Sequence, residues 1–87
     1  DVLDRAMIDL LSFYRDVLTT QMGSDVERVN LDLSDAVDQA ARTTSPEQSL
    51  ARIAAIEECR SRLRSNAAPL LAVEALMVQL RPQAEGR

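Results

Sequence analysis

Apolar side chains recur every three or four residues along the first 21 positions, the spacing of one face of an α-helix. The residues of this stripe are Leu3, Met7, Leu10, Leu11, Tyr14, Val17 and Leu18. A second, partly apolar stripe of Val2, Ala6 and Phe13 widens the face. We therefore predict an amphipathic helix from about Asp1 to Gln21 that touches more than one neighbour. Gly23, just beyond it, suits a helix stop.

Residues 22–32 lack a sustained period and contain glycine, serine, asparagine and aspartate, so they predict a loop with a turn. A short helix is expected from Leu33 to about Arg42. Its alanine-rich face gives little burial but permits close approach of another helix. Either Asp32 or Ser34 is placed to cap its first turn.

A third helix is predicted to begin after Ser45 and to end near Ser65. Ser45 and Gln48 have the spacing of a capping box, and Pro46 fits the first helical position. Glu47 suits the positive end of the helix dipole. The apolar face of this helix consists of Leu50, Ile53, Ile56, Cys59 and Leu63.

The last apolar segment has a different pattern. Asn66 opens a turn, Pro69 lies in the first helical turn, and the helix is predicted to extend to Leu80 before Pro82 ends it. Its apolar residues are Leu70, Leu71, Ala72, Val73, Ala75, Leu76, Met77, Val78 and Leu80. They cover almost the whole circumference, and a helix that is apolar all round has to be buried all round.

These segments predict an all-α fold, a small helical bundle of about four helices. We assign residues 1–81 to a single helical domain and residues 82–87 to a polar tail. A chain of 87 residues buries only about 60 to 65% of its unfolded surface. Its core must be thin and aliphatic, because Phe13 and Tyr14 are the only aromatic residues. The helical period starts at once without an initial Met, and we expect the chain to be a piece of a longer protein.

Three modest helices can cover about half to two-thirds of the last one, so its remaining apolar surface indicates an interaction site. The alternative is that this helix is central and fully wrapped. On the first hypothesis, helical periodicity assigns subunit contacts to Val73, Met77 and Leu80, with Glu74 and Arg81 as polar pins. The opposite side, with Leu71, Leu76 and Val78, is then expected to face the interior.

The polar residues argue against catalysis. The chain has no His, no glycine-rich phosphate loop and no metal-ligand spacing, so we expect no catalytic residue, no cofactor and no metal. Cys59 is the sole cysteine and is expected in the core, and this cysteine usage favours a cytoplasmic protein. The longest apolar run is far shorter than the roughly 20 residues of a membrane span.

Net charge is −4, with fourteen acidic residues and ten basic ones, all arginine, which argues against broad nucleic-acid binding. Four arginines nevertheless lie in the third helix: Arg52, Arg60, Arg62 and Arg64. The simplest interpretation is a solvated helix end in which Arg62 pairs with Glu58 one turn earlier. The alternative function is a nucleic-acid contact module built on this helix.

Several stretches together carry a resemblance to a known family. They are LSFYRDVL at 11–18, Val29-Asn30, Ser45-Pro46-Glu47, IAAIEECR at 53–60 and NAAPLLAVEALM at 66–77. Over about residues 3–81 the chain resembles the C-terminal domain of the delta-prime subunit of the bacterial DNA polymerase III clamp loader. Its Lys-free, Arg- and Ala-rich composition is similar to that of actinobacterial members.

The resemblance implies a collar domain. In that family, the C-terminal helical domains of five subunits pack side by side and hold the ring together while the ATP-driven part opens the sliding clamp. The implied partners are loader subunits of delta and gamma/tau type, with the sliding clamp and primed DNA contacted only indirectly. No membrane and no small-molecule substrate are implied. The chain has no Walker motif and no four-cysteine zinc module, so no ATPase activity is assigned to it.

Overall fold

Four α-helices and one 3-10 turn form the regular structure of residues 2–23, 31–65 and 68–82, which the computed structural model describes. Their bounds are α1 Val2–Gln21, η1 Leu31–Leu33, α2 Ser34–Thr43, α3 Pro46–Arg64 and α4 Pro69–Leu80. No strand occurs within these ranges. The predicted all-α bundle of four helices is therefore confirmed. Most of the predicted loop and tail, and Asn66, lie outside the described residues.

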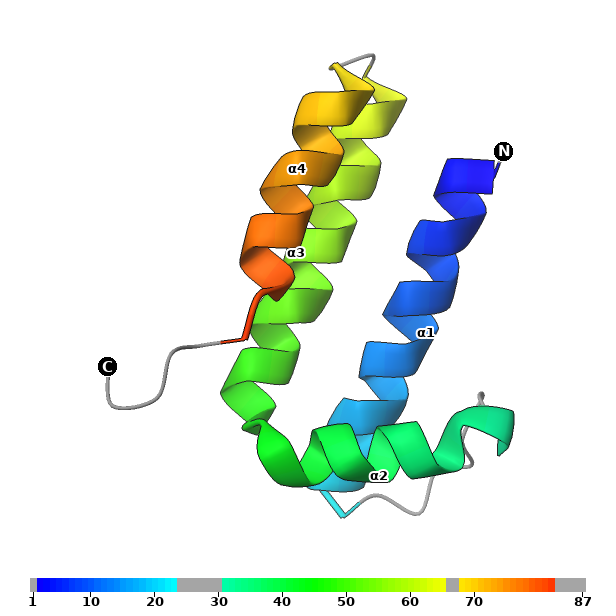
Figure 1. Cartoon of the computed structure of the whole chain (residues 1–87), viewed down its shortest axis with the longest axis vertical. Helices are drawn as coiled ribbons and strands as arrows, with labels where there is room; N and C mark the ends of the chain where they lie inside the picture. Colours follow the sequence, from blue (N-terminus) through cyan, green and yellow to red (C-terminus); the bar gives the residue numbers. More distant parts are fainter. Residues whose placement is uncertain (1, 24–30, 66–67, 83–87) are drawn as a thin grey trace.

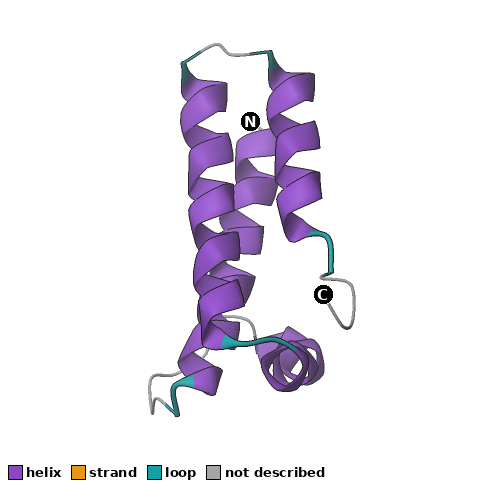
Figure 2. Ribbon diagram, turned by 90° about the vertical axis from the view of Figure 1, so that its left-hand side faces the viewer, coloured by secondary structure: helices purple, strands orange, loops and turns teal. Residues whose placement is uncertain are grey.

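The helix α3 is the centre of the arrangement, because both α1 and α4 pack along it (Figure 1). The helix α4 runs back along α3, beside it in Figure 1. In Figure 2, α3 and α4 stand side by side with α1 behind them. The short helix α2 crosses the far end of α1, where it makes its main contacts. The bundle is therefore three helices with a fourth across one end.

The main core lies where α1, α3 and α4 meet. Its buried side chains are Met7, Leu11, Ile56, Cys59, Ala72 and Leu76. Partly buried residues around it include Leu3, Leu10, Tyr14, Ile53, Leu63, Val73 and Leu80. The periodic stripes predicted for the first and third helices supply most of these positions. Burial of an aliphatic side chain of this size stabilises the fold by about 1.5 to 3 kcal/mol.

A polar junction fixes α2 at the end of α1. The side-chain nitrogen Nε2 of Gln21 donates to the carbonyl oxygen of Thr44 at 2.9 Å and to the Thr44 hydroxyl at 3.1 Å. The Gln21 side-chain oxygen in turn accepts from the hydroxyl of Ser49 at 2.8 Å, and Ser49 is fully buried. Val17 and Val37 are also fully buried. One glutamine thus ties α1, the end of α2 and the start of α3 together.

The predicted start of α3 is confirmed in detail. The Ser45 hydroxyl accepts from the backbone N–H of Gln48 at 3.1 Å, and the Gln48 side chain accepts from the backbone N–H of Ser45 at 2.8 Å. Pro46 occupies the first turn, as expected. Gly23 follows α1 with φ +70°, a left-handed conformation that glycine adopts without steric cost.

The predicted side-chain cap of α2 is wrong. Neither Asp32 nor Ser34 is its N-cap; Leu33 holds that position, and no side-chain hydrogen bond caps the helix. The physical reason is the 3-10 turn, which leads directly into α2 and leaves Leu33 at φ −111°, ψ 20°. A capping side chain reaches the first free N–H groups from an extended residue, which is absent here.

Replacing Ser45 by Ala is expected to lower the free energy of unfolding by about 1 kcal/mol, because it removes the hydroxyl that caps α3. Urea unfolding followed by circular dichroism measures this change. Ser61→Ala is the control, since Ser61 is exposed inside the same helix, and its effect should stay within about 0.5 kcal/mol. Equal effects of the two variants would contradict the capping role.

Candidate subunit interface

The helix α4 exposes large apolar side chains on its outer side. Leu70 is 70% exposed, Leu71 66%, Met77 59% and Val78 56%. They lie within a single helix of 12 residues. A cluster of exposed apolar side chains is uncommon on a soluble monomer and usually marks an interaction surface. The alternative that α4 is central and fully wrapped is wrong, because α3 holds the central position.

The inward side of α4 differs in part from the predicted one. Leu76 is buried as expected, but Leu71 and Val78, also expected inside, are exposed. Ala72 takes the contact position instead, and Ala75 lines the same junction with α3. Alanine permits the close approach of two helices, whereas Leu71 would hold them apart. This packing turns the larger side chains outward.

The five predicted contact residues are therefore divided. Met77, Glu74 and Arg81 are exposed, as a contact surface requires. Val73 and Leu80 are half-buried and pack against the core of their own chain. Their contact with another subunit stays a prediction, and their packing role in the monomer was missed. Because apolar residues surround the whole helix, the sequence does not indicate which of them face the core and which face outward.

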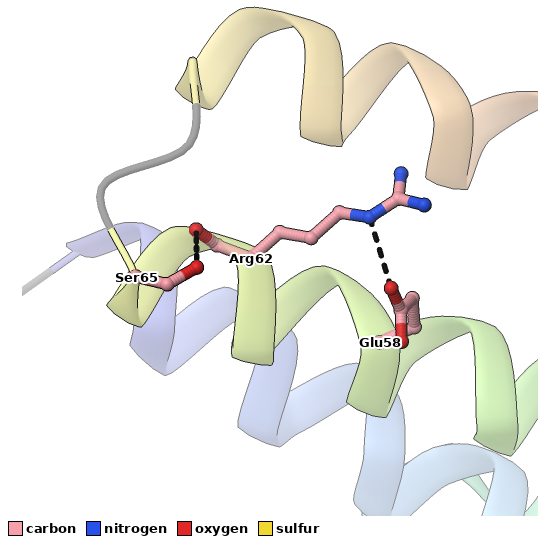
Figure 3. A network of polar contacts seen from close by, with 3 residues as sticks. All are labelled: Glu58, Arg62 and Ser65. Atoms are coloured by element: carbon pink, nitrogen blue, oxygen red, sulfur yellow. Dashed lines mark hydrogen bonds and ion pairs between the residues drawn. The ribbon is translucent and has the colours of Figure 1, made fainter.

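A shallow groove lies between α3 and α4, and the exposed leucines, valine and methionine of α4 are not among its lining residues. It measures about 500 Å³, and its lining comes from α3 and α4. The floor consists mainly of small residues, namely Ala51, Ala54, Ala55, Ala72 and Ala75. Glu58 and Arg62 border it and form an ion pair of 3.0 Å (Figure 3). This pair was expected from the i,i+4 spacing and is confirmed.

A comparison with protein families finds a match that covers most of the chain. Residues 4–81 match the family described as DNA polymerase III, delta subunit, C terminal. The chain belongs to this family. No curated protein and no solved structure matches it. The resemblance to a clamp-loader C-terminal domain is thus confirmed, while the narrower delta-prime assignment stays a prediction.

In this clamp-loader domain, the arginines of α3 do not form one basic surface. The Arg60 Nε donates to the Asp4 carboxylate of α1 at 3.1 Å, and Arg62 pairs with Glu58. The guanidinium of Arg52 lies over the Tyr14 ring, 5.6 Å from its centroid. Three of the four arginines thus make contacts within the chain, which disfavours a nucleic-acid module on this helix.

Cys59 lies in the core of the domain, as predicted. It is 2% exposed, and its burial raises the pKa of the thiol above the usual 9.0, opposed in part by the nearby positive charge of Arg62. A raised pKa disfavours the thiolate, which is the reactive form. The geometry therefore suits a small packing residue. None of the helices described has the length and apolar character needed to cross a membrane.

Cys59 is expected to react with DTNB at pH 8 at least about tenfold more slowly in the folded domain than in urea, because folding both covers the sulfur and disfavours its thiolate. Absorbance of the released thionitrobenzoate follows the reaction. Equal rates in the two conditions would show that the thiol is accessible in the folded domain.

Proposed function

We propose that this domain is a collar module of a DNA polymerase III clamp-loader subunit, of delta-prime type, which joins the subunit to its neighbours in the ring. Its partners would be loader subunits of delta and gamma/tau type. The domain itself would be non-catalytic and cytoplasmic, and it would contact the sliding clamp and primed DNA only indirectly. Family membership supports the setting, and the exposed apolar side of α4 supports the role.

The single observation that carries the proposal is the position of α4 at the edge of the bundle. Its apolar side chains have α3 and part of α1 as neighbours, and α2 is placed at the far end of α1. A neighbouring subunit that covers Leu70, Met77 and their surroundings would remove this surface from water. Each large apolar side chain so buried stabilises an interface by up to about 1.5 to 3 kcal/mol.

The nucleic-acid alternative has weaker support. Arg60 and Arg62 are paired with carboxylates of the chain itself, and the net charge of −4 repels phosphate. Lack of binding to a short DNA duplex at low salt is the result that agrees with the collar role. Binding that is lost in Arg60→Ala/Arg64→Ala would support the alternative.

Met77→Asp is expected to weaken binding of the purified chain to purified delta and gamma/tau subunits by about tenfold or more, because it would bury a carboxylate in an apolar interface. The thermal melt should stay nearly unchanged, since Met77 is exposed. Fluorescence anisotropy or calorimetry measures the affinity.

Met22→Asp is the matched control. Met22 is 67% exposed and lies just beyond the end of α1 that α2 crosses, whereas α4 packs along α3. It should bind like the unmodified chain. Failure of the unmodified chain to bind any loader subunit would refute the proposed function, and a large loss of thermal stability in Met77→Asp would show that Met77 is internal.

A further inference from the structure

The groove between α3 and α4 has a distinctive distribution of charge. A second, smaller hollow of about 80 Å³ adjoins it, since Ala51 and Gln79 line both. Arg52 and Arg81 border this second hollow. Arg62 borders the main groove, eleven residues from Ala51 along α3. The groove thus has Arg62 towards one end, Arg81 towards the other and alanines between them, while the guanidinium of Arg52 lies over the Tyr14 ring.

The geometry points to a helix from the adjacent loader subunit as the occupant of this groove. We propose that this helix presents small or apolar side chains to the alanine floor and a carboxylate towards each end, about three turns apart. One carboxylate would meet Arg62, and the other would meet Arg81. This inference rests on the proposed function and names the surface and chemistry that the neighbour uses.

The shape of the groove favours a helix as the occupant. Side chains as small as alanine on both walls allow a third helix to approach to an axial distance of about 8 to 10 Å. Eleven residues of α3 correspond to about 16 Å, or three helical turns. Ala51, Ala54 and Ala75 line the groove and are exposed. A docked helix would cover these alanines, which the monomer leaves in water.

The charges favour an acidic occupant. The two hollows are bordered by three arginines and one glutamate, although the whole chain carries a net charge of −4. Glu58 binds only the Nε of Arg62, and Figure 3 shows the terminal guanidinium nitrogens pointing away from Glu58. Those nitrogens have the geometry to donate to a carboxylate of a partner. Charge complementarity therefore selects carboxylates over basic groups.

Two variants test the groove by different means in the same assay with purified delta and gamma/tau subunits. Ala75→Glu fills the floor with a longer, negative side chain. Arg62→Glu/Arg81→Glu reverses the charge towards both ends. Each is expected to weaken binding at least tenfold, and raising the salt concentration should weaken binding of the unmodified chain more than that of the double variant.

Matched controls carry the same substitutions elsewhere. Ala6→Glu places the new carboxylate on the exposed side of α1, and Arg5→Glu/Arg42→Glu makes the same change in charge on α1 and α2. Both controls should bind within about twofold of the unmodified chain. Thermal melts of all four variants establish that each is folded before its affinity is compared.

The outcomes separate this inference from the function on which it rests. If the chain binds loader subunits, and the groove variants bind as tightly as their controls, the groove is not the contact surface although the collar role stands. Equal loss in groove variants and controls would show an unspecific effect of charge and would also overturn the inference. If the unmodified chain binds no loader subunit, both proposals fail.

Discussion

A helix with apolar side chains around most of its circumference needs neighbours on several sides, and α4 has its long contact with one helix, α3. The buried side chains of α4 are Ala72 and Leu76, which join the core shared with α1. The leucines, valine and methionine of its outer side remain in water. Every functional statement about this domain depends on that unequal distribution, because it leaves apolar surface where another subunit can bind.

The apolar side of α4 stays exposed because α2 lies at the other end of the bundle. Gln21 and Ser49 hold the junction of α2 and α3 at the end of α1, where Val17 and Val37 are buried. A helix fixed there cannot cover α4. The chain thus uses one of its four helices to close an end of the bundle, and the side of α4 that α2 might have covered stays open. The groove over the α3–α4 junction follows from the same arrangement.

The sequence predicted the helices well and the orientation of the last one poorly. Ser45, Pro46 and Gln48 determine the start of α3 through local hydrogen bonds and backbone geometry, so their spacing alone is sufficient. The rotation of α4 about its axis is different in kind. When apolar residues surround a helix, periodicity does not choose an inner face, and the choice falls to the closest packing. Ala72 is small enough to occupy the contact with α3, and Leu71 and Val78 point outward.

Two polar features were also missed. The cap of α2 was predicted from Asp32 and Ser34, but the preceding 3-10 turn removes the extended residue that such a cap needs. The pairing of Arg60 with Asp4 joins residues 56 positions apart, which no local pattern indicates. Of the residues predicted for the interface, Met77 is exposed, as that role requires, and its contact with another subunit stays a prediction.

The orientation of α4 can be measured with two leucines of the same helix. Leu76→Ala removes a buried side chain and should lower the free energy of unfolding by about 2 to 5 kcal/mol, whereas Leu71→Ala removes an exposed one and should change it by less than about 0.5 kcal/mol. Urea unfolding of the two variants gives both values directly. Equal losses, or a larger loss in Leu71→Ala, would contradict the packing on which the account is built.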